Sequence, residues 1–514
     1  MIRSIAQRLS DRKRRIQRRL KVANGSAKYI RAAQEAPPML RTSGLRYELS
    51  DKVRGVAHGG AALFMKLAKD VGLVDAIDRN LHLLKVHCPY HESDHVLNFA
   101  INALCDGDCL QDIELRRTDE AFLDMLGTSS IPDPTTSGDF CRRFKKSDLD
   151  DLQRAIDVAR LNVWKQQPDE FFDEAEIDAD GTFVITDAEC KQGMDISYKG
   201  EWGYHPLVVT LANTGEPLRI VNRPGNRPSH EGAAPMLDEA IALCRQAGFR
   251  KVRLRGDTDF SQTAHLDRWT SDGVLFSFGY DAHLSLKCQA ELLPESAWSK
   301  LERPAKYQVR TTPRRKPRNV KRAIIRRREF LHLELKSEQV AEFLYRPTAC
   351  SNEYRMIIVR KNISKEMGDL VLFNDIRYFF YITNDFHQTS AEVVWECNDR
   401  CNQENQISQL AGGVRALQAP VASLVSNGAY MLMTSLAWTL KAWAALLLPI
   451  HNGCQDQHQQ EKKALLRMEF KTFINAVVRI PCQIVRQARQ TFVRVMNWNP
   501  YLPAFFRLAN VLNC

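Results

Sequence analysis

The sequence has thirteen cysteines but no Cys-x-x-Cys pair. The closest spacings, Cys105/Cys109 and Cys397/Cys401, are one helical turn apart, so we expect these side chains to pack as small hydrophobic groups. A zinc site is therefore not expected, and scattered cysteines of odd number fit a reducing cytosol better than a disulfide framework. The basic N-terminus also lacks the apolar core of a signal peptide.

The sequence also lacks an uninterrupted apolar run long enough to cross a membrane. The nearest approach is residues 429–449, which are rich in Leu, Ala, Met and Trp but contain Lys441. A lysine at the centre of a spanning helix costs roughly 2.5–3.5 kcal/mol of insertion free energy. We therefore predict a helix buried in the protein core, and a membrane protein is an alternative that rests on this segment alone.

Acidic residues are missing from the two most basic segments of a chain of 514 residues with a formal charge of +11. Residues 1–31 hold eleven Lys and Arg and a single acid, Asp11, and residues 303–328 hold twelve Lys and Arg and no acid. Either run alone is explained as a solvated face or tail. Two runs far apart in sequence favour binding to the phosphate backbone of a nucleic acid.

The first third of the chain has helical spacing of apolar residues, between about residues 45 and 161. Within it, residues 135–137 are expected to cap a short basic helix that carries Arg142, Arg143 and Lys145. Such a helix can enter a DNA groove, and it is explained equally well as an ordinary solvated helix.

After residue 171 the pattern becomes strand-like, with a helix predicted at residues 235–247 and further strands after it. Hairpin strands followed by strand–helix alternation predict an α/β fold with a mixed five-stranded sheet. Residues 284–375 interrupt this pattern with strand-like pieces and the Arg-rich run, which indicates a β-rich insertion. Residues 389–392 then form a capping box for a helix that carries Glu404.

Three acids lie where a metal-dependent phosphoryl-transfer site would need them. Asp180 and Asp257 end predicted strands, and Glu404 lies on the later helix. Three such carboxylates can hold two divalent cations across a scissile phosphate. Asp178 lies on the same strand face as Asp180, and Asp259 follows Asp257 closely, so spacing alone does not choose within either pair; an Asp at a strand end is also a common turn former.

Glu404 is predicted to face inward. On a helix from Thr389 to Leu410 it falls within an apolar stripe that includes Val394, Cys397, Cys401, Ile407 and Ala411. An isolated buried charge costs several kcal/mol, so Glu404 is expected to be paired, protonated or bound to a metal. Arg400, one turn earlier, is the alternative partner.

Several short strings together resemble a known family. The chain is similar to DDE-type transposases of bacterial insertion sequences, in the cut-and-paste group with a Tyr-Arg-Glu-Lys signature, and most of all to insertion-sequence family thirteen-eighty. The strings span about residues 45–440 and are Tyr47-Glu48-Leu49-Ser50-Asp51, Tyr90-His91-Glu92-Ser93-Asp94-His95, Thr135-Thr136-Ser137-Gly138-Asp139-Phe140, Asp180-Gly181-Thr182, Gly203-Tyr204-His205-Pro206-Leu207, Arg223-Pro224-Gly225-Asn226, Arg255-Gly256-Asp257 and Arg400 to Leu410.

The resemblance implies an RNase H-like catalytic domain interrupted by a β-strand insertion and preceded by a helical DNA-binding domain. It implies that Asp180, Asp257 and Glu404 are the catalytic acids and hold two Mg²⁺ ions, for which Mn²⁺ can substitute. Arg400 keeps the Arg-x3-Glu spacing of the signature, whereas Cys397 stands in place of its Tyr and Ala411 in place of its Lys.

The expected partner is double-stranded DNA, both the terminal repeats of the element and the target, with a homodimer in the DNA complex and no membrane. The residues expected to contact DNA are Arg142, Arg143, Lys145, Arg314, Arg315, Arg318, Arg322 and Arg400. The expected location is the bacterial cytoplasm, in association with the nucleoid. The alternative function is that of a catalytically impaired, transposase-derived DNA-binding protein, which the Cys397 and Ala411 departures favour.

The predicted organisation has six parts. They are a basic arm (residues 1–40), a helical DNA-binding domain (41–165), the first part of the catalytic domain (170–288), the basic β-rich insertion (289–375), the second part of the catalytic domain (376–450) and a C-terminal helical region (451–514).

Overall fold

A large mixed sheet runs through the centre of the protein. The computed structural model describes residues 4–24, 53–87, 89–188, 190–302, 324, 327–328, 331–367, 370–399, 401–487 and 490–513. In this part of the chain nine strands form one sheet, and all but the pairs β2–β8 and β8–β9 are antiparallel. In spatial order the strands are β10 (Ser299–Lys300), β11 (Leu331–Tyr345), β12 (Tyr354–Met367), β13 (Leu370–Thr383), β9 (Leu275–Tyr280), β8 (Lys251–Gly256), β2 (Glu174–Gly181), β6 (Leu207–Leu211) and β7 (Glu216–Val221).

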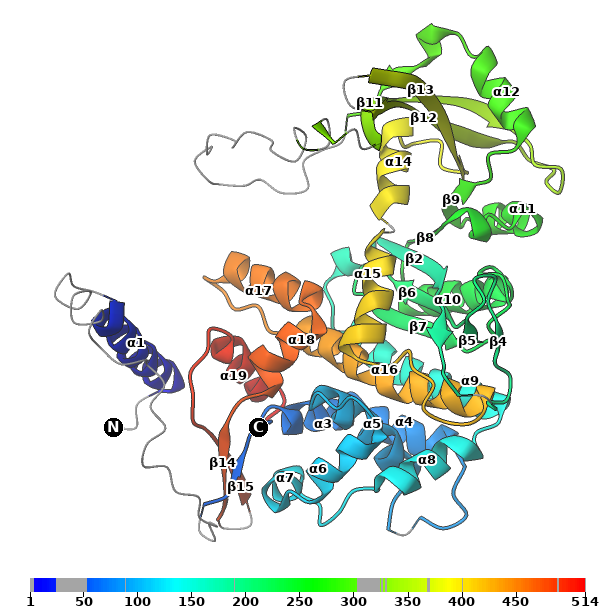
Figure 1. Cartoon of the computed structure of the whole chain (residues 1–514). Helices are drawn as coiled ribbons and strands as arrows, with labels where there is room; N and C mark the ends of the chain where they lie inside the picture. The colour runs from blue at the N-terminus through cyan, green and yellow to red at the C-terminus, as the bar shows by residue number, and fades with distance from the viewer. Residues whose placement is uncertain are drawn as a thin grey trace.

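The predicted mixed α/β sheet is confirmed, but it is larger than the five strands expected. Strands β7, β6, β2, β8 and β9 are the predicted five, and β13 pairs with β9 in antiparallel register at Phe380↔Tyr280. The β-rich insertion therefore continues the same sheet, which spacing along the sequence does not reveal. The insertion, β11 to β13, lies at the top of Figure 1, above the other strands.

Helices cover the sheet and build the rest of the protein (Figure 1). The segment before the sheet contains α3 (Ala61–Asp70), α4 (Leu73–Asn80), α5 (Glu92–Leu104), α6 (Ile113–Arg117), α7 (Glu120–Leu126), α8 (Pro134–Arg143) and α9 (Lys146–Trp164). Those that follow β7, β8 and β9 are α10 (Ala233–Ala247), α11 (Thr263–Ser271) and α12 (Leu284–Leu292). The helix predicted at residues 235–247 is thus present and ends, as expected, at Gly248 in the left-handed conformation.

The second half of the chain returns to this core after the insertion. It contains α14 (Ser390–Asp399), α15 (Cys401–Ser408), α16 (Leu424–Leu446), α17 (Gln455–Arg467), α18 (Phe470–Phe473) and α19 (Leu502–Val511). A small sheet of β1 (Gly55–Val56), β14 (Cys482–Gln487) and β15 (Gln490–Val495) ties the C-terminal part to the start of the helical segment. Of the N-terminal basic arm, α1 (Ile5–Asn24) is described, and its Arg12 donates to the Val495 and Asn497 carbonyls.

The apolar segment around Lys441 forms α16, and the prediction of a buried helix is confirmed because nearly all of its residues are buried. Lys441 itself is 1% exposed. Its ammonium donates to the Leu466 carbonyl at 2.8 Å and lies 3.8 Å from the centre of the Trp438 ring. Among the helices that the structure describes, none combines the length and apolar character needed to cross a membrane.

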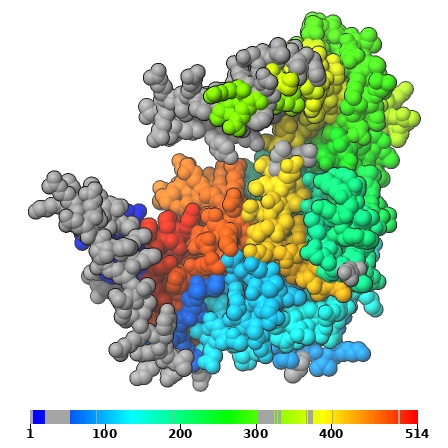
Figure 2. Space-filling model, in the orientation of Figure 1, coloured from blue at the N-terminus to red at the C-terminus, as the bar shows by residue number. Residues whose placement is uncertain are grey.

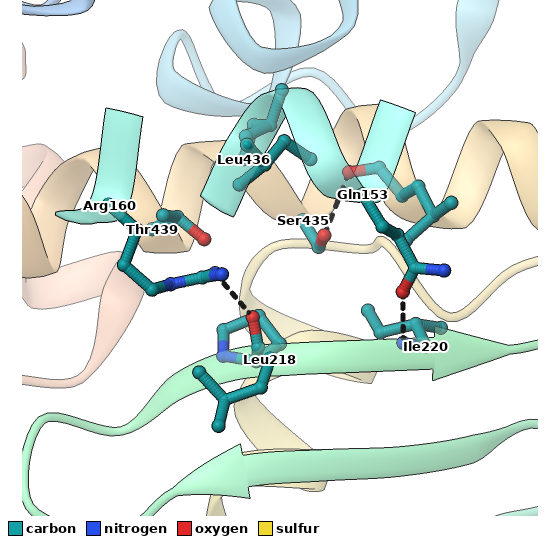
Figure 3. A pocket seen from close by; sticks show the side chains of 10 residues that line it. Gln153, Arg160, Leu218, Ile220, Ser435, Leu436 and Thr439 are labelled. Atoms are coloured by element: carbon teal, nitrogen blue, oxygen red, sulfur yellow. Dashed lines mark hydrogen bonds between the residues drawn. The ribbon is translucent and has the colours of Figure 1, made fainter. Parts of the chain in front are cut away.

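A buried carboxylate joins α9 and α16 to the sheet. Glu216, at the start of β7, is fully buried and accepts hydrogen bonds from Trp164, Trp443, Thr214 and Arg160 at 2.7–3.2 Å. Beside it lies a cavity of about 10 Å³ lined by both polar and apolar side chains, which is room for about one water molecule. Figure 3 shows this cavity with its lining side chains, which include Gln153, Arg160, Ser435 and Thr439.

One predicted cap is wrong. Asp133, not residues 135–137, caps the basic helix α8: its carboxylate accepts from the Thr136 backbone N–H at 2.8 Å, and Pro134 takes the first helical position. The capping box before α14 is confirmed, because Thr389 N donates to Glu392 and Glu392 N donates to the Thr389 hydroxyl.

Candidate active site

Two of the three predicted acids lie on neighbouring strands at the same edge of the sheet. Strands β2 and β8 are parallel, and Asp178 is paired in register with Arg255. Asp180 and Asp257 each follow two residues later. Because β2 and β8 are parallel, Asp180 and Asp257 both lie just beyond this last pair, at the carboxyl ends of the two strands. Both residues are half-buried.

A buried ion pair distinguishes the environment of Asp178 from that of Asp180. The guanidinium of Arg255 donates to both carboxylate oxygens of Asp178, at 2.7 and 2.9 Å, and also contacts Glu176 at 2.7 Å. Asp178 is 2% exposed and Arg255 is 3% exposed. Burial acts to lower the pKa of Arg255, but the Asp178 and Glu176 carboxylates hold it above its usual value. Asp178 is thus engaged by a fixed cation inside the protein.

Arg253 makes a second cluster of the same kind two residues earlier on β8. It contacts Glu174 at 2.6 Å, Asp385 at 2.8 Å and Glu396 at 2.9 Å. Burial raises the pKa of Glu396, and the charge of Arg253 opposes that shift. Since Glu396 lies on α14 and Asp385 follows β13, Arg253 links the strand that ends at Asp257 to the insertion and to the helix after it.

Asp257 begins the short helical turn Thr258–Phe260, and its carboxylate accepts from Asp259 N at 2.9 Å. Asp259 itself is exposed. The preceding Gly256 is needed for packing, because a Cβ there would lie 2.6 Å from Cβ of Phe260. The close approach that this glycine permits is therefore that of the Phe260 side chain.

Gly181, after Asp180, is similarly crowded. A Cβ at this position would lie 2.9 Å from Nε2 of His205. The other ring nitrogen of His205 lies 2.6 Å from the Arg227 carbonyl, and its backbone carbonyl accepts from Arg223 at 2.9 Å. Burial lowers the pKa of His205. Three of the strings quoted from the sequence, around Asp180, His205 and Arg223, thus meet at this point.

The predicted orientation of Glu404 is wrong. Glu404 is exposed, and the inward position at this level is taken by Gln403, which is 2% exposed. The amide of Gln403 accepts from the Thr210 hydroxyl and donates to the Val208 carbonyl at 3.2 Å, both on β6. Figure 2 shows the region of α15, in yellow, at the surface between the green sheet region and the orange C-terminal helices.

Helical spacing predicts one apolar stripe along a single helix, but the segment forms two helices, α14 and α15. Val394 and Cys397 on α14 pack into a separate cluster with residues of the insertion, such as Ile357. Ile407 and Leu410 belong instead to the main core. Because α14 and the segment from α15 onward bury against different partners, their buried faces do not form one continuous stripe. Glu404 therefore lies next to the buried face of α15 and not within it.

The three acids do not form a closed metal cluster in this arrangement. Across the residues that the structure describes, no group of three or more His, Cys, Asp and Glu side chains is placed to hold a metal ion. The donor chemistry still fits a hard divalent cation, because Asp180, Asp257 and Glu404 offer carboxylate oxygens alone.

The family of the chain follows from a comparison of its sequence with family models. The model described as transposase DDE domain group 1 matches residues 53–513. The chain belongs to this transposase family. A search of curated proteins found no match. Among solved structures, the transposase is similar to a piggyBac transposase in a cryo-EM structure of its synaptic complex with hairpin DNA. The identity is 8% over 82% of each chain, with a TM-score of 0.36, a likeness too low to support an argument.

The predicted DNA-contacting residues of the transposase are described only in part. Arg142, Arg143 and Lys145 are exposed at and just after the end of α8, and Arg142 pairs with Asp139. The others lie outside the described residues, namely Arg314, Arg315, Arg318, Arg322 and Arg400. Of the two departures from the signature, Cys397 is buried and Ala411 is half-buried.

Sequence reasoning missed Gln403 and the paired charges of β2 and β8. The paired charges can be recognised in the sequence. Acids occur at every second position of β2, at Glu174, Glu176 and Asp178, and arginines occur in the same way on β8, at Arg253 and Arg255. Matching alternation of opposite charges on two strands is typical of neighbours in a sheet. Gln403 left no such signal, because a glutamine before the third acid is unremarkable until its partners on β6 are known.

Proposed function

We propose that this transposase binds the ends of an insertion sequence and cuts phosphodiester bonds there, with Asp180, Asp257 and Glu404 as its catalytic acids. The observation that supports the proposal is the parallel pairing of β2 and β8, because Asp180 and Asp257 each follow the Asp178–Arg255 pair by two residues in a chain of the transposase DDE family. The order β7-β6-β2-β8-β9, antiparallel and then parallel, supports an RNase H-like catalytic domain.

The choice of Asp180 over Asp178 is supported by the Arg255 ion pair. A carboxylate held bidentately by a buried guanidinium is already compensated, and withdrawing it for metal binding would leave the buried Arg255 with Glu176 as its remaining close carboxylate. Asp180 lies two residues nearer the sheet edge, beside Asp257. The choice of Asp257 over Asp259 is supported by the position of Asp257 at the strand end, whereas Asp259 is exposed in the following turn.

Glu404 would complete the site from α15. Gln403 attaches that helix to β6 at Val208, which is the register partner of Asp180. Glu404 is the next residue along, so a modest movement of its exposed side chain, or of α15 when DNA binds, would bring its carboxylate toward the pair. Two divalent cations held by these acids would activate the attacking oxygen and stabilise the leaving oxygen.

In this account the protein supplies positioning and charge, and no covalent protein–DNA intermediate is required. Asp180 and Asp257 at the strand ends and Glu404 from α15 would supply the carboxylates, while the basic segments would bind the DNA backbone. The partners would be the element ends and the target duplex, with a homodimer holding two ends together. The same scheme requires both strand cleavage and later attack by the freed 3′-hydroxyl.

A second candidate is a transposase-derived DNA-binding protein without cleavage activity. The Cys397 and Ala411 departures favour it, because a buried thiol and a methyl group cannot make the contacts of a tyrosine and a lysine.

The test is incubation of the purified chain with Mg²⁺ and a duplex that carries the element's end, with nicking and binding measured in parallel. Nicking that is abolished by EDTA supports the transposase, whereas tight end binding without nicking supports the second candidate. A chain that binds no DNA overturns both.

A further inference from the structure

An exposed aromatic hairpin extends from the strands that carry the candidate site. It comprises β4 (Asp195–Ile196), a turn, and β5 (Trp202–Tyr204), and we call it the aromatic hairpin. Tyr198 at its tip is 94% exposed, which leaves almost the whole ring in solvent. Trp202 and Ile196 form a cross-strand pair and are 49% and 43% exposed. Large apolar side chains left in water on a formed hairpin indicate a partner that covers them.

The hairpin is held in place by its backbone. Strand β3 (Val184–Ile185) pairs with β5, and the Thr186 N–H donates to the Trp202 carbonyl at 3.0 Å. The turn closes through Ser197 N to the Glu201 carbonyl at 2.7 Å, with Gly200 at a φ of 84°. At the base of the hairpin, the buried Tyr204 donates to the Gln192 carbonyl at 3.0 Å. The exposed rings therefore sit on a fixed support.

This support is directly connected to the candidate site. The hairpin begins at Asp195, after β3 and beyond the end of β2 at Gly181, and its second strand returns through His205 and Pro206 into β6 at Leu207. Leu207 is the register partner of Gly181. Trp202 lies five positions before Leu207, which spans at most about 17 Å of extended chain.

We propose that the aromatic hairpin stacks on unpaired bases of the DNA strand at the cleavage site. This inference rests on the proposed function, because it takes the cleaved DNA as the partner. Aromatic rings stack on bases whatever the sequence, but only on bases that have left the duplex. Lys199, whose ammonium lies 5.5 Å from the centre of the Tyr198 ring, can contact the neighbouring phosphate.

The alternative occupant is a second copy of the chain, and the size of the surface argues against it. Stable protein interfaces bury about 1,200–2,000 Å² in total. Two rings and one isoleucine on a narrow hairpin cannot supply that area. A single DNA strand can bind through a few stacked bases, and the exposed rings of Tyr198 and Trp202 are large enough for that.

The experiment measures binding of single-stranded oligothymidylate of about ten nucleotides and of the end-bearing duplex, by fluorescence anisotropy. Tyr198→Ala and Trp202→Ala are each expected to weaken single-strand binding by about 5- to 150-fold. Tyr198→Phe should retain binding, since the ring remains. Phe386→Ala is the matched control, because Phe386 is a 61% exposed aromatic in a loop next to the insertion.

Tyr198→Ala keeps the test sound even if Trp202→Ala disturbs the hairpin, because a side chain this exposed contributes little to folding. Unchanged single-strand binding by Tyr198→Ala would overturn the proposal while leaving the proposed function in place. Unchanged binding together with a weaker dimer in sedimentation would overturn it in favour of a second copy. Failure of the wild-type chain to bind any DNA would instead overturn the proposed function.

Discussion

The side-chain amide of Gln403 donates to the backbone carbonyl of Val208, which is paired in register with Asp180. This bond joins α15, the helix that carries Glu404, to β6, the strand that pairs with β2 at Asp180. It also explains why a polar residue faces inward on α15, since both ends of the amide find partners on β6. The geometry of the candidate site thus depends on a residue with no chemistry of its own.

Gln403→Met should impair cleavage more than its loss of stability accounts for. Removing the amide leaves Val208 and Thr210 without this partner and costs about 1–3 kcal/mol of unfolding free energy. A displacement of Glu404 of about 1 Å would lower the nicking rate about 100-fold. The measurement is nicking per folded molecule, with stability from urea unfolding.

Gln406→Met is the matched control. Gln406 lies on the same helix and donates to the Gly215 carbonyl at 2.8 Å, at the far end of β6 from Asp180. It should lose stability without a comparable loss of nicking. Equal losses of nicking in both variants would remove any special role for Gln403.

Asp178→Asn and Asp180→Asn should fail in different ways. Asp178→Asn breaks a buried bidentate pair and is expected to cost up to about 3–5 kcal/mol of unfolding free energy, because Arg255 then keeps only the more exposed Glu176 as a close carboxylate. Asp180→Asn should fold and bind end DNA but not cut it. Thermal unfolding and nicking are measured for both proteins. A stable Asp178→Asn protein that cannot cut would show that Asp178, and not Asp180, is the catalytic acid.

Asp257→Asn should abolish cleavage with little change in fold, because asparagine caps a helical turn about as well as aspartate. Asp259→Asn removes an exposed carboxylate and should cut at close to the wild-type rate. If Asp259→Asn proves inactive while Asp257→Asn cuts normally, the second acid has been assigned to the wrong residue.

Stability should rise with pH in a window set by Lys441. Burial lowers the pKa of Lys441 to about 7, against about 10.4 in an unfolded chain. Between these values the unfolded state binds a proton that the folded state does not, so the unfolding free energy rises by up to about 1.4 kcal/mol per pH unit. Below pH 7 both states are protonated and this contribution levels off.

Lys441→Met should remove that dependence, which urea unfolding at pH 7 and pH 9 would measure. Lys463→Met, at an exposed position on α17, is the control and should keep the wild-type slope. A Lys441→Met protein whose stability changes with pH as the wild type does would show that another group is responsible.

Neutralising the predicted DNA-contacting cations should weaken DNA binding, whereas replacing the acids should stop cleavage. Replacing Arg314, Arg315 and Arg318 with glutamine should weaken binding to all sequences and reduce the salt dependence by up to about 0.9 for each lost phosphate contact. The same change at Arg142, Arg143 and Lys145 tests α8, whose exposed cations are described by the structure. An unchanged salt slope for either set would remove that set from the DNA interface.

The sequence was sufficient for features that depend on local pattern. The strands ending at Asp180 and Asp257, the helix ended by Gly248 and the buried helix around Lys441 each follow from periodicity and capping residues within one segment. The addition of the insertion strands to the main sheet was not predictable, because the pairing of β13 with β9 joins residues about a hundred positions apart. Local pattern contains no information about that register.

The orientation of Glu404 within the candidate site also could not be predicted from local pattern. Helical spacing placed it in an apolar stripe, but α14 and α15 bury against different partners, so the inward residue at this level is Gln403. The choice between Asp178 and Asp180 likewise required Arg255, which spacing along β2 could not supply.

The most direct test measures Mg²⁺-dependent nicking and end binding by Asp180→Asn, Asp257→Asn and Glu404→Gln. Glu404 is exposed, so Glu404→Gln should alter the unfolding free energy by less than about 0.5 kcal/mol. The account predicts that all three proteins fold, bind the end-bearing duplex as the wild type does, and produce no nicks above background. A Glu404→Gln or Asp257→Asn protein that nicks at the wild-type rate would contradict it.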